Sequence, residues 1–253
     1  MKVWLAADID RVCVTGDLVN FAEEPEFARA AIELARLAEK SPVSLVPGNH
    51  DALVRAGRDH QERYWGQWLK AAPPAPGWPT VTVAGPMVFI GVSTAISSPP
   101  FLAWGQVSES QLSALKAQLQ RFPPDRYFRV VMLHHPPQAR ATGWRHALRN
   151  AEAVRDVLAD AGAELVLHGH LHRETRSWLG GPDAPIPVFG SGSCSRLAAA
   201  GKQERGHFSL FEVKASSSET WELEVTDYFH DVATGTFRGG PITGVRPPPP
   251  ART

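Results

Sequence analysis

The feature that most limits the fold is an alternation of short β-branched runs with helical patterns. Residues 12–15 and 43–46 read as strands on either side of a helical stretch over 25–40. A second helical pattern over 151–161 precedes another strand-like run at 164–167. Strands that alternate with helices favour parallel pairing through crossover helices. We therefore expect an α/β fold.

Two local signals refine the middle of the chain. Residues 80–83 and 87–92 flank a Gly-Pro turn and predict a β-hairpin. Ser108 and Gln111 fit a capping box that opens a helix running towards Phe122. The next buried strand is expected at 129–133.

The last third is turn-rich and strand-like. Candidate strands at 188–189, 207–213 and 221–229 predict a second sheet. Residues 239–253 include four consecutive prolines and few apolar side chains, so we expect a flexible tail. A single domain over 1–238 accommodates the rest of the chain.

Composition limits the partners and the compartment. Lys plus Arg and Asp plus Glu both total 26, so global charge gives no support for binding nucleic acid or an anionic membrane. Cys13 and Cys194 are far apart and form no clustered pattern, which favours a reducing cytoplasm over a disulfide framework. No apolar stretch reaches the roughly 20 residues of a membrane span. The oligomeric state stays open.

Four apolar runs end in side chains that can bind metal. The clusters are Asp17, then Asn49, His50 and Asp51, then His134 and His135, then His168, His170 and His172. The carboxyl ends of parallel strands share one edge of a sheet, so these clusters should converge there. Oxygen and imidazole ligands without thiolate suit zinc, manganese or iron. His170 and His172 are two residues apart, and in extended backbone both would face the same side.

The ordered set of Gly16-Asp17, Gly48-Asn49-His50-Asp51, His134 and Gly169-His170-Leu171-His172 resembles the signature of the calcineurin-like metallophosphoesterases. The resemblance spans roughly residues 11–213. It implies a fold of the α/β/β/α sandwich type, with two mixed β-sheets flanked by helices. It also implies hydrolysis of phosphate esters, most simply small phosphodiesters, by a metal-activated hydroxide at a dinuclear centre that holds two divalent or trivalent ions of Mn, Fe or Zn.

The resemblance assigns a role to each matched residue. Asp17 would bridge the two metals, and His172 would serve the first site. The second site would be completed by Asn49, His134 and His170. His50 would contact the phosphate and protonate the leaving oxygen, with Asp51 orienting its ring. His135 is expected behind the ligands and His168 in a structural role.

One part of the family signature is missing. The family opens with a strand that ends in Asp-x-His, and Asp8-Ile9-Asp10 cannot replace it, because a parallel neighbour needs a crossover of a dozen or more residues. We interpret residues 3–9 as the end of that crossover helix. The first strand is then missing either through genuine truncation or through a start assigned too far downstream, and we favour the second. The chain as given is then expected to retain one tightly held metal and impaired activity.

Alternative functions remain open. The fold could serve as a non-catalytic or vestigial binding module. A nuclease has less support because the charge is balanced. Cyclic nucleotides, glycerophosphodiesters, nucleotide pyrophosphates and monoesters are all candidate substrates. Four tryptophans are expected to pack in the core or on the surface rather than to line a pocket: Trp65, Trp68, Trp78 and Trp104.

Overall fold

A six-stranded mixed sheet forms the centre of the molecule. The computed structural model describes residues 9–69, 77–99, 101–139, 141–195, 206–215 and 221–247. The sheet has the strand order β3-β4-β5-β6-β8-β7. Its strands are β3 (Thr80–Ala84), β4 (Met87–Gly91), β5 (Phe128–Met132), β6 (Leu165–His168), β7 (Thr175–Leu179) and β8 (Ile186–Gly190). The four central strands run parallel to one another, while β3 and β7 are antiparallel edges.

Two smaller sheets and four α-helices complete the described fold. A four-stranded antiparallel sheet contains β9 (His207–Ala215), β10 (Trp221–Asp231), β11 (Thr236–Gly239) and β12 (Thr243–Gly244). A parallel pair contains β1 (Val12–Val14) and β2 (Val43–Leu45). The helices are α1 (Glu24–Ala38), α2 (Ala56–Leu69), α3 (Glu109–Arg121) and α4 (Ala151–Ala161), with short 3-10 turns η2 (His50–Ala52) and η3 (Trp144–His146).

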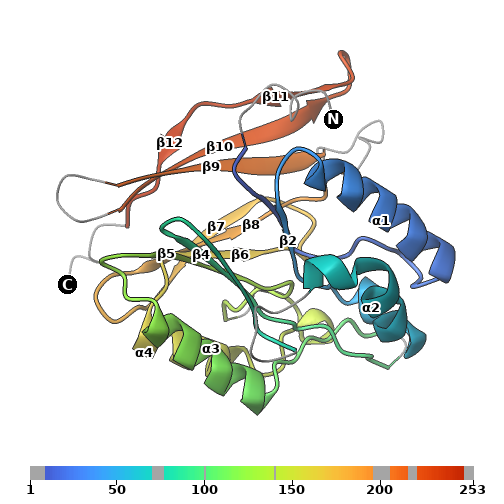
Figure 1. Cartoon of the computed structure of the whole chain (residues 1–253), viewed down its shortest axis with the longest axis horizontal. Coiled ribbons are helices and arrows are strands. Elements are labelled where there is room, and N and C mark those ends of the chain that lie inside the picture. The colour runs from blue at the N-terminus through green and yellow to red at the C-terminus, as the bar shows by residue number, and fades with distance from the viewer. Residues whose placement is uncertain are drawn as a thin grey trace.

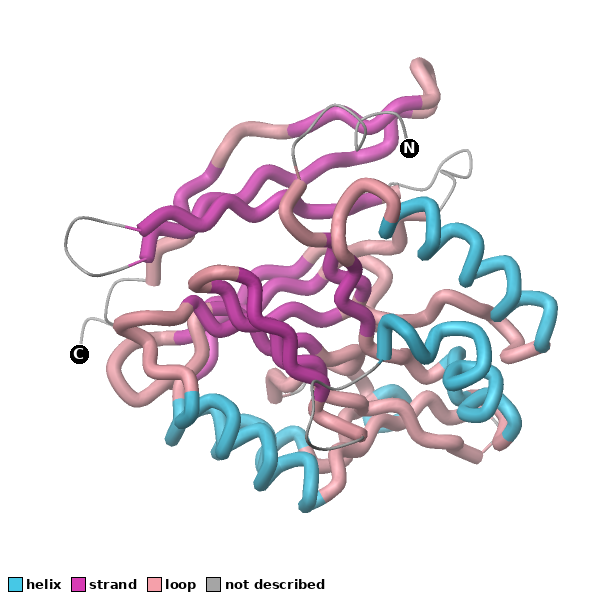
Figure 2. The backbone as a smooth tube through the Cα atoms, in the orientation of Figure 1, coloured by secondary structure: helices cyan, strands magenta, loops and turns pink. Residues whose placement is uncertain are grey.

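The layers follow from the faces that each element buries. In Figure 1 α3 and α4 lie below the six-stranded sheet, the four-stranded sheet lies above it, and α1 and α2 lie together on one side of β2. Figure 2 shows the same separation of strand layers and helices. Leu115 and Leu158 from the two lower helices pack on Val131 in one cluster, whereas Phe211 and Val225 from the upper sheet pack in another with Met132. The predicted α/β fold, with a mixed sheet and flanking helices, is confirmed, while the second large sheet is antiparallel rather than mixed.

Local sequence accounts for α1. Proline occupies its first turn, as predicted. The Glu26 carboxylate accepts hydrogen bonds from the backbone N–H of Asn20, Phe21 and Glu23, which fixes the loop that enters the helix. Phe27 and Leu34 are buried on one face, beside the fully buried indole of Trp65. Packing is therefore the role of Trp65, as expected.

The structure contains one helix that the sequence analysis does not predict. The buried positions of α2 are Gly57, Gln61 and Trp65, spaced four residues apart. Two of these are not large apolar residues, so the helical face carries no apolar period. At the start of α3 the predicted capping box is half right. Ser108 Oγ accepts from Gln111 N–H at 3.2 Å, but the Gln111 side chain bonds the backbone of residue 93 instead.

The predicted tail begins too early. Gly239 ends β11, and β12 pairs with β10 through backbone hydrogen bonds. Val245 packs against the cluster between the two larger sheets. Strand pairing and the contact of Val245 hold residues 239–247 against the fold, so the predicted start of the tail at residue 239 is corrected. Residues 248–253 lie outside the described part of the chain.

The direction of β1 places its two ends far apart. Asp10 precedes the strand and is exposed, whereas Asp17 follows it. Asp10 and Asp17 therefore lie at opposite ends of the three-residue strand β1. Residues 3–8 of the predicted crossover helix lie outside the described residues.

Candidate metal centre

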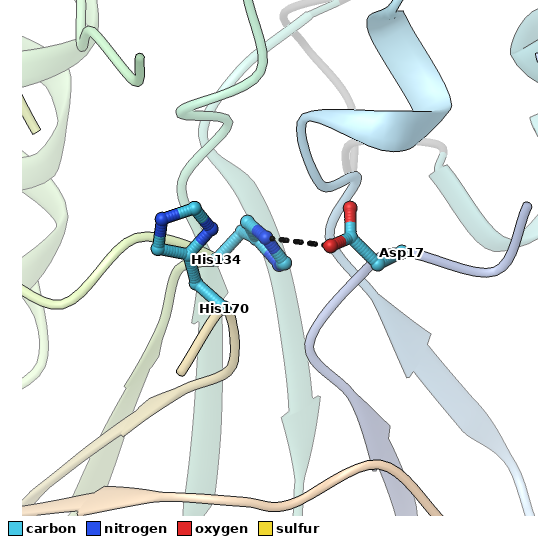
Figure 3. Close-up of side chains that lie close together, drawn as sticks. All are labelled: Asp17, His134 and His170. Carbon is cyan, nitrogen blue, oxygen red and sulfur yellow. Dashed lines mark ion pairs between the residues drawn. The ribbon is translucent and has the colours of Figure 1, made fainter. Parts of the chain in front are cut away.

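Three of the predicted ligands meet where the strands end. Asp17 follows β1, His134 follows β5 and His170 follows β6, and one ligand atom from each lies within 4.8 Å of the other two. Figure 3 shows the His134 ring between the other two side chains. Asp17 follows the β1–β2 pair and therefore lies beside two histidines of the central sheet, although at least 117 positions of the sequence separate it from either of them.

The turn that carries Asp17 depends on glycine. Gly16 has φ +94° and Asp17 has φ +57°, so the chain reverses in the left-handed region directly after β1. A side chain on Gly48 would collide with the Asp17 carboxylate. Asp17 Oδ1 accepts a hydrogen bond of 2.9 Å from the backbone N–H of His50. These contacts fix the carboxylate against the loop that follows β2.

His134 is held in one tautomer by the backbone. Its Nδ1–H donates to the carbonyl of Thr15 at 2.6 Å, so the Nε2 lone pair faces inward. Nε2 lies 3.2 Å from Asp17 Oδ2 and 3.1 Å from Asn49 Oδ1. Burial opposes a charge on His134, but the adjacent carboxylate outweighs it and raises the pKa of this imidazole.

His170 is oriented in the opposite sense. Its Nε2–H donates to the carbonyl of His146 at 2.9 Å, which leaves the Nδ1 lone pair 2.9 Å from Asn49 Oδ1. Burial, together with the neighbouring His134, lowers the pKa of His170 to about 3. His170 and His172 have φ of 66° and 53°, so the prediction that extended backbone aligns them is wrong. The left-handed backbone conformation of each residue sets the direction of its imidazole instead.

Four lone-pair donors thus face one another in a buried space. They are Asp17 Oδ2, Asn49 Oδ1, His134 Nε2 and His170 Nδ1. Asp17 Oδ2 is buried and makes no hydrogen bond within the described residues. A bound cation would satisfy all four atoms at once. With His134 unprotonated at Nε2, the set has one anionic and three neutral ligands, and its oxygen and imidazole atoms fit Mn, Fe or Zn.

Asp51 has a different role from the predicted one. Its buried carboxylate accepts backbone N–H groups of residues 17, 18, 19 and 48 at 2.7–3.2 Å. It therefore ties the loop after β1 to the loop after β2, and the structure gives it no contact with the His50 ring. Burial and the negative charge of Asp17 raise the pKa of Asp51 to about 6.

His50 is oriented by backbone instead. Its Nδ1–H donates to the carbonyl of Asn20 at 2.8 Å, and the ring is partly exposed. A carbonyl can hold a ring in one tautomer as well as a carboxylate can, but it adds no full charge. Nε2 of His50 stays available to a ligand.

The predicted first-site ligand His172 lies near the same carboxylate. Its Nε2 is 4.0 Å from Asp17 Oδ2, and its side chain is 51% exposed. Among the described residues, Asp17 and His172 are the candidate ligands on this side. A catalytic metal ordinarily has three or more protein ligands.

Two further histidines support the cluster without joining it. His135 Nε2–H donates to the carbonyl of Ala103 at 3.2 Å, and Nδ1 accepts from Thr94 Oγ1 at 2.7 Å. Burial lowers the pKa of His135 well below its usual value. His168 is fully buried and faces Gly169 and Thr175. Both placements agree with the predicted supporting roles.

A second acidic and imidazole group does not fit a metal. Glu174, His207 and Asp227 lie close together. The backbone N–H of Gly192 donates to His207 Nδ1 at 3.0 Å, so Nε2 carries the proton and donates to Asp227 Oδ1 at 3.2 Å. That nitrogen has no lone pair for a cation. The group is a hydrogen-bonded network between β7 and the upper sheet.

The groups that orient the imidazoles could not be identified from the sequence. They are the backbone carbonyls of Thr15, Asn20, Ala103 and His146. Every residue has a carbonyl, so residue type gives no signal of this role. Only the path of the chain reveals it.

Comparison with known proteins gives a consistent family. The sequence profile of the calcineurin-like phosphoesterases matches residues 2–174. A probable cyclic nucleotide phosphodiesterase of Rhodopseudomonas palustris is 31% identical over 183 residues, which are 69% of this chain and 61% of that protein. A probable glycerophosphodiester phosphodiesterase of Arcobacter nitrofigilis is 29% identical over 67% of this chain and 59% of that protein.

A solved structure shares the fold. A dimetal phosphatase from Danio rerio superposes with a TM-score of 0.54 at 14% identity, covering 90% of this chain and 80% of that one. The chain spans about three fifths of the length of the two bacterial relatives. The profile match covers more than half of the sequence, and the chain therefore belongs to the calcineurin-like phosphoesterase family.

Proposed function

We propose that this chain carries the hydrolytic centre of a metal-dependent phosphodiesterase. The observation that carries the proposal is the buried convergence of Asp17 Oδ2, Asn49 Oδ1, His134 Nε2 and His170 Nδ1. When bound, a divalent or trivalent ion supplies Lewis-acid chemistry: it lowers the pKa of a water and offsets charge on the phosphoryl oxygens. The protein supplies the rigid ligand set.

His50 is the proposed proton donor to the leaving oxygen. The hydrogen bond from Nδ1–H to the Asn20 carbonyl leaves Nε2 as the atom that faces the substrate, and Nε2 can donate a proton when the ring is doubly protonated. The backbone N–H of His50 donates to Asp17 Oδ1, so the ring is fixed relative to the metal ligands. Asp51 acts through the backbone of the two loops rather than on the substrate.

One ion is proposed to bind tightly in the chain as given. Asn49, His134 and His170 with Asp17 make a complete second site, whereas the first site has Asp17 and the half-exposed His172. A dinuclear centre in a longer form of the protein would need further ligands for the first ion. Impaired turnover of this chain is part of the same proposal.

The proposed substrate is a small phosphodiester. Both bacterial relatives bear names of diester hydrolases, one for cyclic nucleotides and one for glycerophosphodiesters. We propose the cytoplasm as the compartment, since both cysteines are free thiols. None of the helices in the described part of the chain combines the length and hydropathy of a membrane span. Residues 1–238, together with the paired residues 239–247, are proposed as one phosphoesterase unit.

A non-catalytic binding module is the second candidate. The first site has two candidate ligands among the described residues, which favours this module, because hydrolysis by two metals requires both ions in place. One experiment separates the candidates: Mn²⁺-dependent hydrolysis of bis(p-nitrophenyl) phosphate by the wild type and by Asp17→Asn. The phosphodiesterase proposal expects turnover that falls at least about 100-fold in the variant.

The matched control is Asp59→Asn, an exposed carboxylate on α2. It should retain wild-type turnover. Equal turnover in Asp17→Asn and wild type would refute the proposed site. Absence of turnover in a wild-type protein that binds Mn²⁺ would support the binding module instead.

A further inference from the structure

Two loops form a paired wall beside the metal centre. Residues 101–105 lie between β4 and α3, and residues 142–149 precede α4. Their backbones are joined by three hydrogen bonds: Ala103 N–H to the Arg145 carbonyl at 2.8 Å, Gly105 N–H to Ala147 at 3.1 Å, and Arg149 N–H to Gly105 at 2.9 Å. This ladder makes the two loops one structural unit.

The wall is attached directly to the imidazoles. The Ala103 carbonyl accepts from His135 Nε2, and the His146 carbonyl accepts from His170 Nε2. A side chain on Gly105 would strike the His135 ring, so the contact is close. Whatever the wall carries on its outer surface is therefore held at a fixed position relative to His170.

The outer surface carries two indoles and two guanidinium groups. The rings of Trp104 and Trp144 are 6.3 Å apart, and Trp104 Nε1–H donates to the Trp144 carbonyl at 2.8 Å. Arg145 lies over the Trp144 ring at 5.4 Å, and Arg149 lies over Trp104 at 5.0 Å. We call these four residues the indole rim.

The indole rim is open to solvent, unlike the aromatic side chains of the hydrophobic core. Trp144 is 67% exposed, and it opens the turn η3 whose last residue, His146, holds His170. Neither Arg145 nor Arg149 forms an ion pair with a described residue. An accessible aromatic face beside unpaired positive charge matches a flat aromatic ligand that carries negative charge.

We propose that the indole rim binds the planar aromatic group of the substrate, with that group stacked on Trp144. The preferred substrate class would then be phosphodiesters that carry an aromatic base or ring, rather than glycerol-type alkyl diesters. Arg145 and Arg149 would add attraction for the phosphate. This inference rests on the proposed function, because it assigns the rim to the same hydrolytic site.

The test is a binding measurement that needs no turnover. Calorimetric titration of the full chain in Mn²⁺ compares adenosine 5′-monophosphate with ribose 5-phosphate, which lacks the base. We expect the nucleotide to bind at least about tenfold more tightly. Trp144→Ala should remove that tenfold ratio, equivalent to about 1.4 kcal/mol, while Trp144→Phe should keep most of it. Ile32→Ala, which truncates an exposed side chain on α1, is the control and should preserve the ratio.

Three outcomes would overturn the inference. The two ligands could bind equally, the ratio could survive Trp144→Ala, or the wild-type chain could form a dimer that Trp144→Ala dissociates, in which case a second copy covers the rim. Failure of the proposed function looks different. The chain would not hydrolyse bis(p-nitrophenyl) phosphate, yet the nucleotide preference would still depend on Trp144.

Discussion

Asp51→Asn should loosen the metal centre from behind. The carboxylate accepts four backbone N–H groups, two on each oxygen: Leu18 and Val19 on Oδ1, Asp17 and Gly48 on Oδ2. Asparagine keeps one acceptor oxygen and presents an NH₂ donor in place of the other. Two buried N–H groups would therefore face a donor.

The expected cost follows from those two groups. A buried donor left without its partner costs about 1–3 kcal/mol, so the pair costs about 2–6 kcal/mol. Removing the negative charge beside Asp17 offsets part of this, which favours the lower half of the range. For a chain of this size, 3 kcal/mol corresponds to a fall in Tm of roughly 6–12 °C.

The assay is thermal unfolding followed by circular dichroism, with metal affinity measured on the same samples. Loss of a group that orients metal ligands typically weakens binding about 10–100-fold, so the Mn²⁺ Kd should rise by that factor. Asp59→Asn is the control. If Asp51→Asn unfolds within about 2 °C of the wild type, the carboxylate does not hold the two loops and our reasoning about it is wrong.

Three further perturbations test other parts of the structure. Gly48→Ala should weaken Mn²⁺ binding at least about tenfold, because the added methyl group would collide with the Asp17 carboxylate. Gly66→Ala, which adds a methyl group in open space, is the control. Equal Mn²⁺ affinities of the two variants would contradict the prediction. Glu164→Gln should lower the free energy of unfolding in urea by about 3 kcal/mol, since its partner Arg129 is 4% exposed. Lys116→Gln, in an exposed ion pair, should lower it by under about 1 kcal/mol. Similar losses in the two variants would refute the prediction that the buried pair matters more. Burial opposes ionisation of Asp227, but hydrogen bonds from an imidazole, a hydroxyl and a guanidinium outweigh burial and lower the pKa of this carboxyl. The ionised carboxylate therefore stabilises the fold above pH ~4, and this stabilisation is lost as the pH falls further. The Tm gap between wild type and Asp227→Asn should therefore narrow between pH 6 and pH 3, and a constant gap would contradict this.

Much of the fold could be predicted because the central strands are buried on both faces. All five residues of β5 are buried and four of them are apolar, so the strand can be recognised in the sequence despite Arg129. The helix α2 could not be predicted in the same way, because glycine and glutamine occupy two of its three buried positions. Residues 239–247 contain too few apolar groups to predict the pairing of β12 with β10.

The site shows a similar division. Asp17, His134 and His170 could be placed together because chain direction brings the ends of parallel strands to one edge. The role of Asp51 could not be predicted, because its partners are backbone N–H groups on a loop more than 30 residues away. Trp144 gave no signal either, since its position depends on pairing between two loops that lack regular patterns.

The most direct test of the metal centre is a crystal structure of the full chain soaked in Mn²⁺, with anomalous diffraction recorded above and below the metal absorption edge. We predict a peak within bonding distance of Asp17 Oδ2, Asn49 Oδ1, His134 Nε2 and His170 Nδ1. A peak beside Glu174 and His207, or no peak at saturating Mn²⁺, would contradict the central claim.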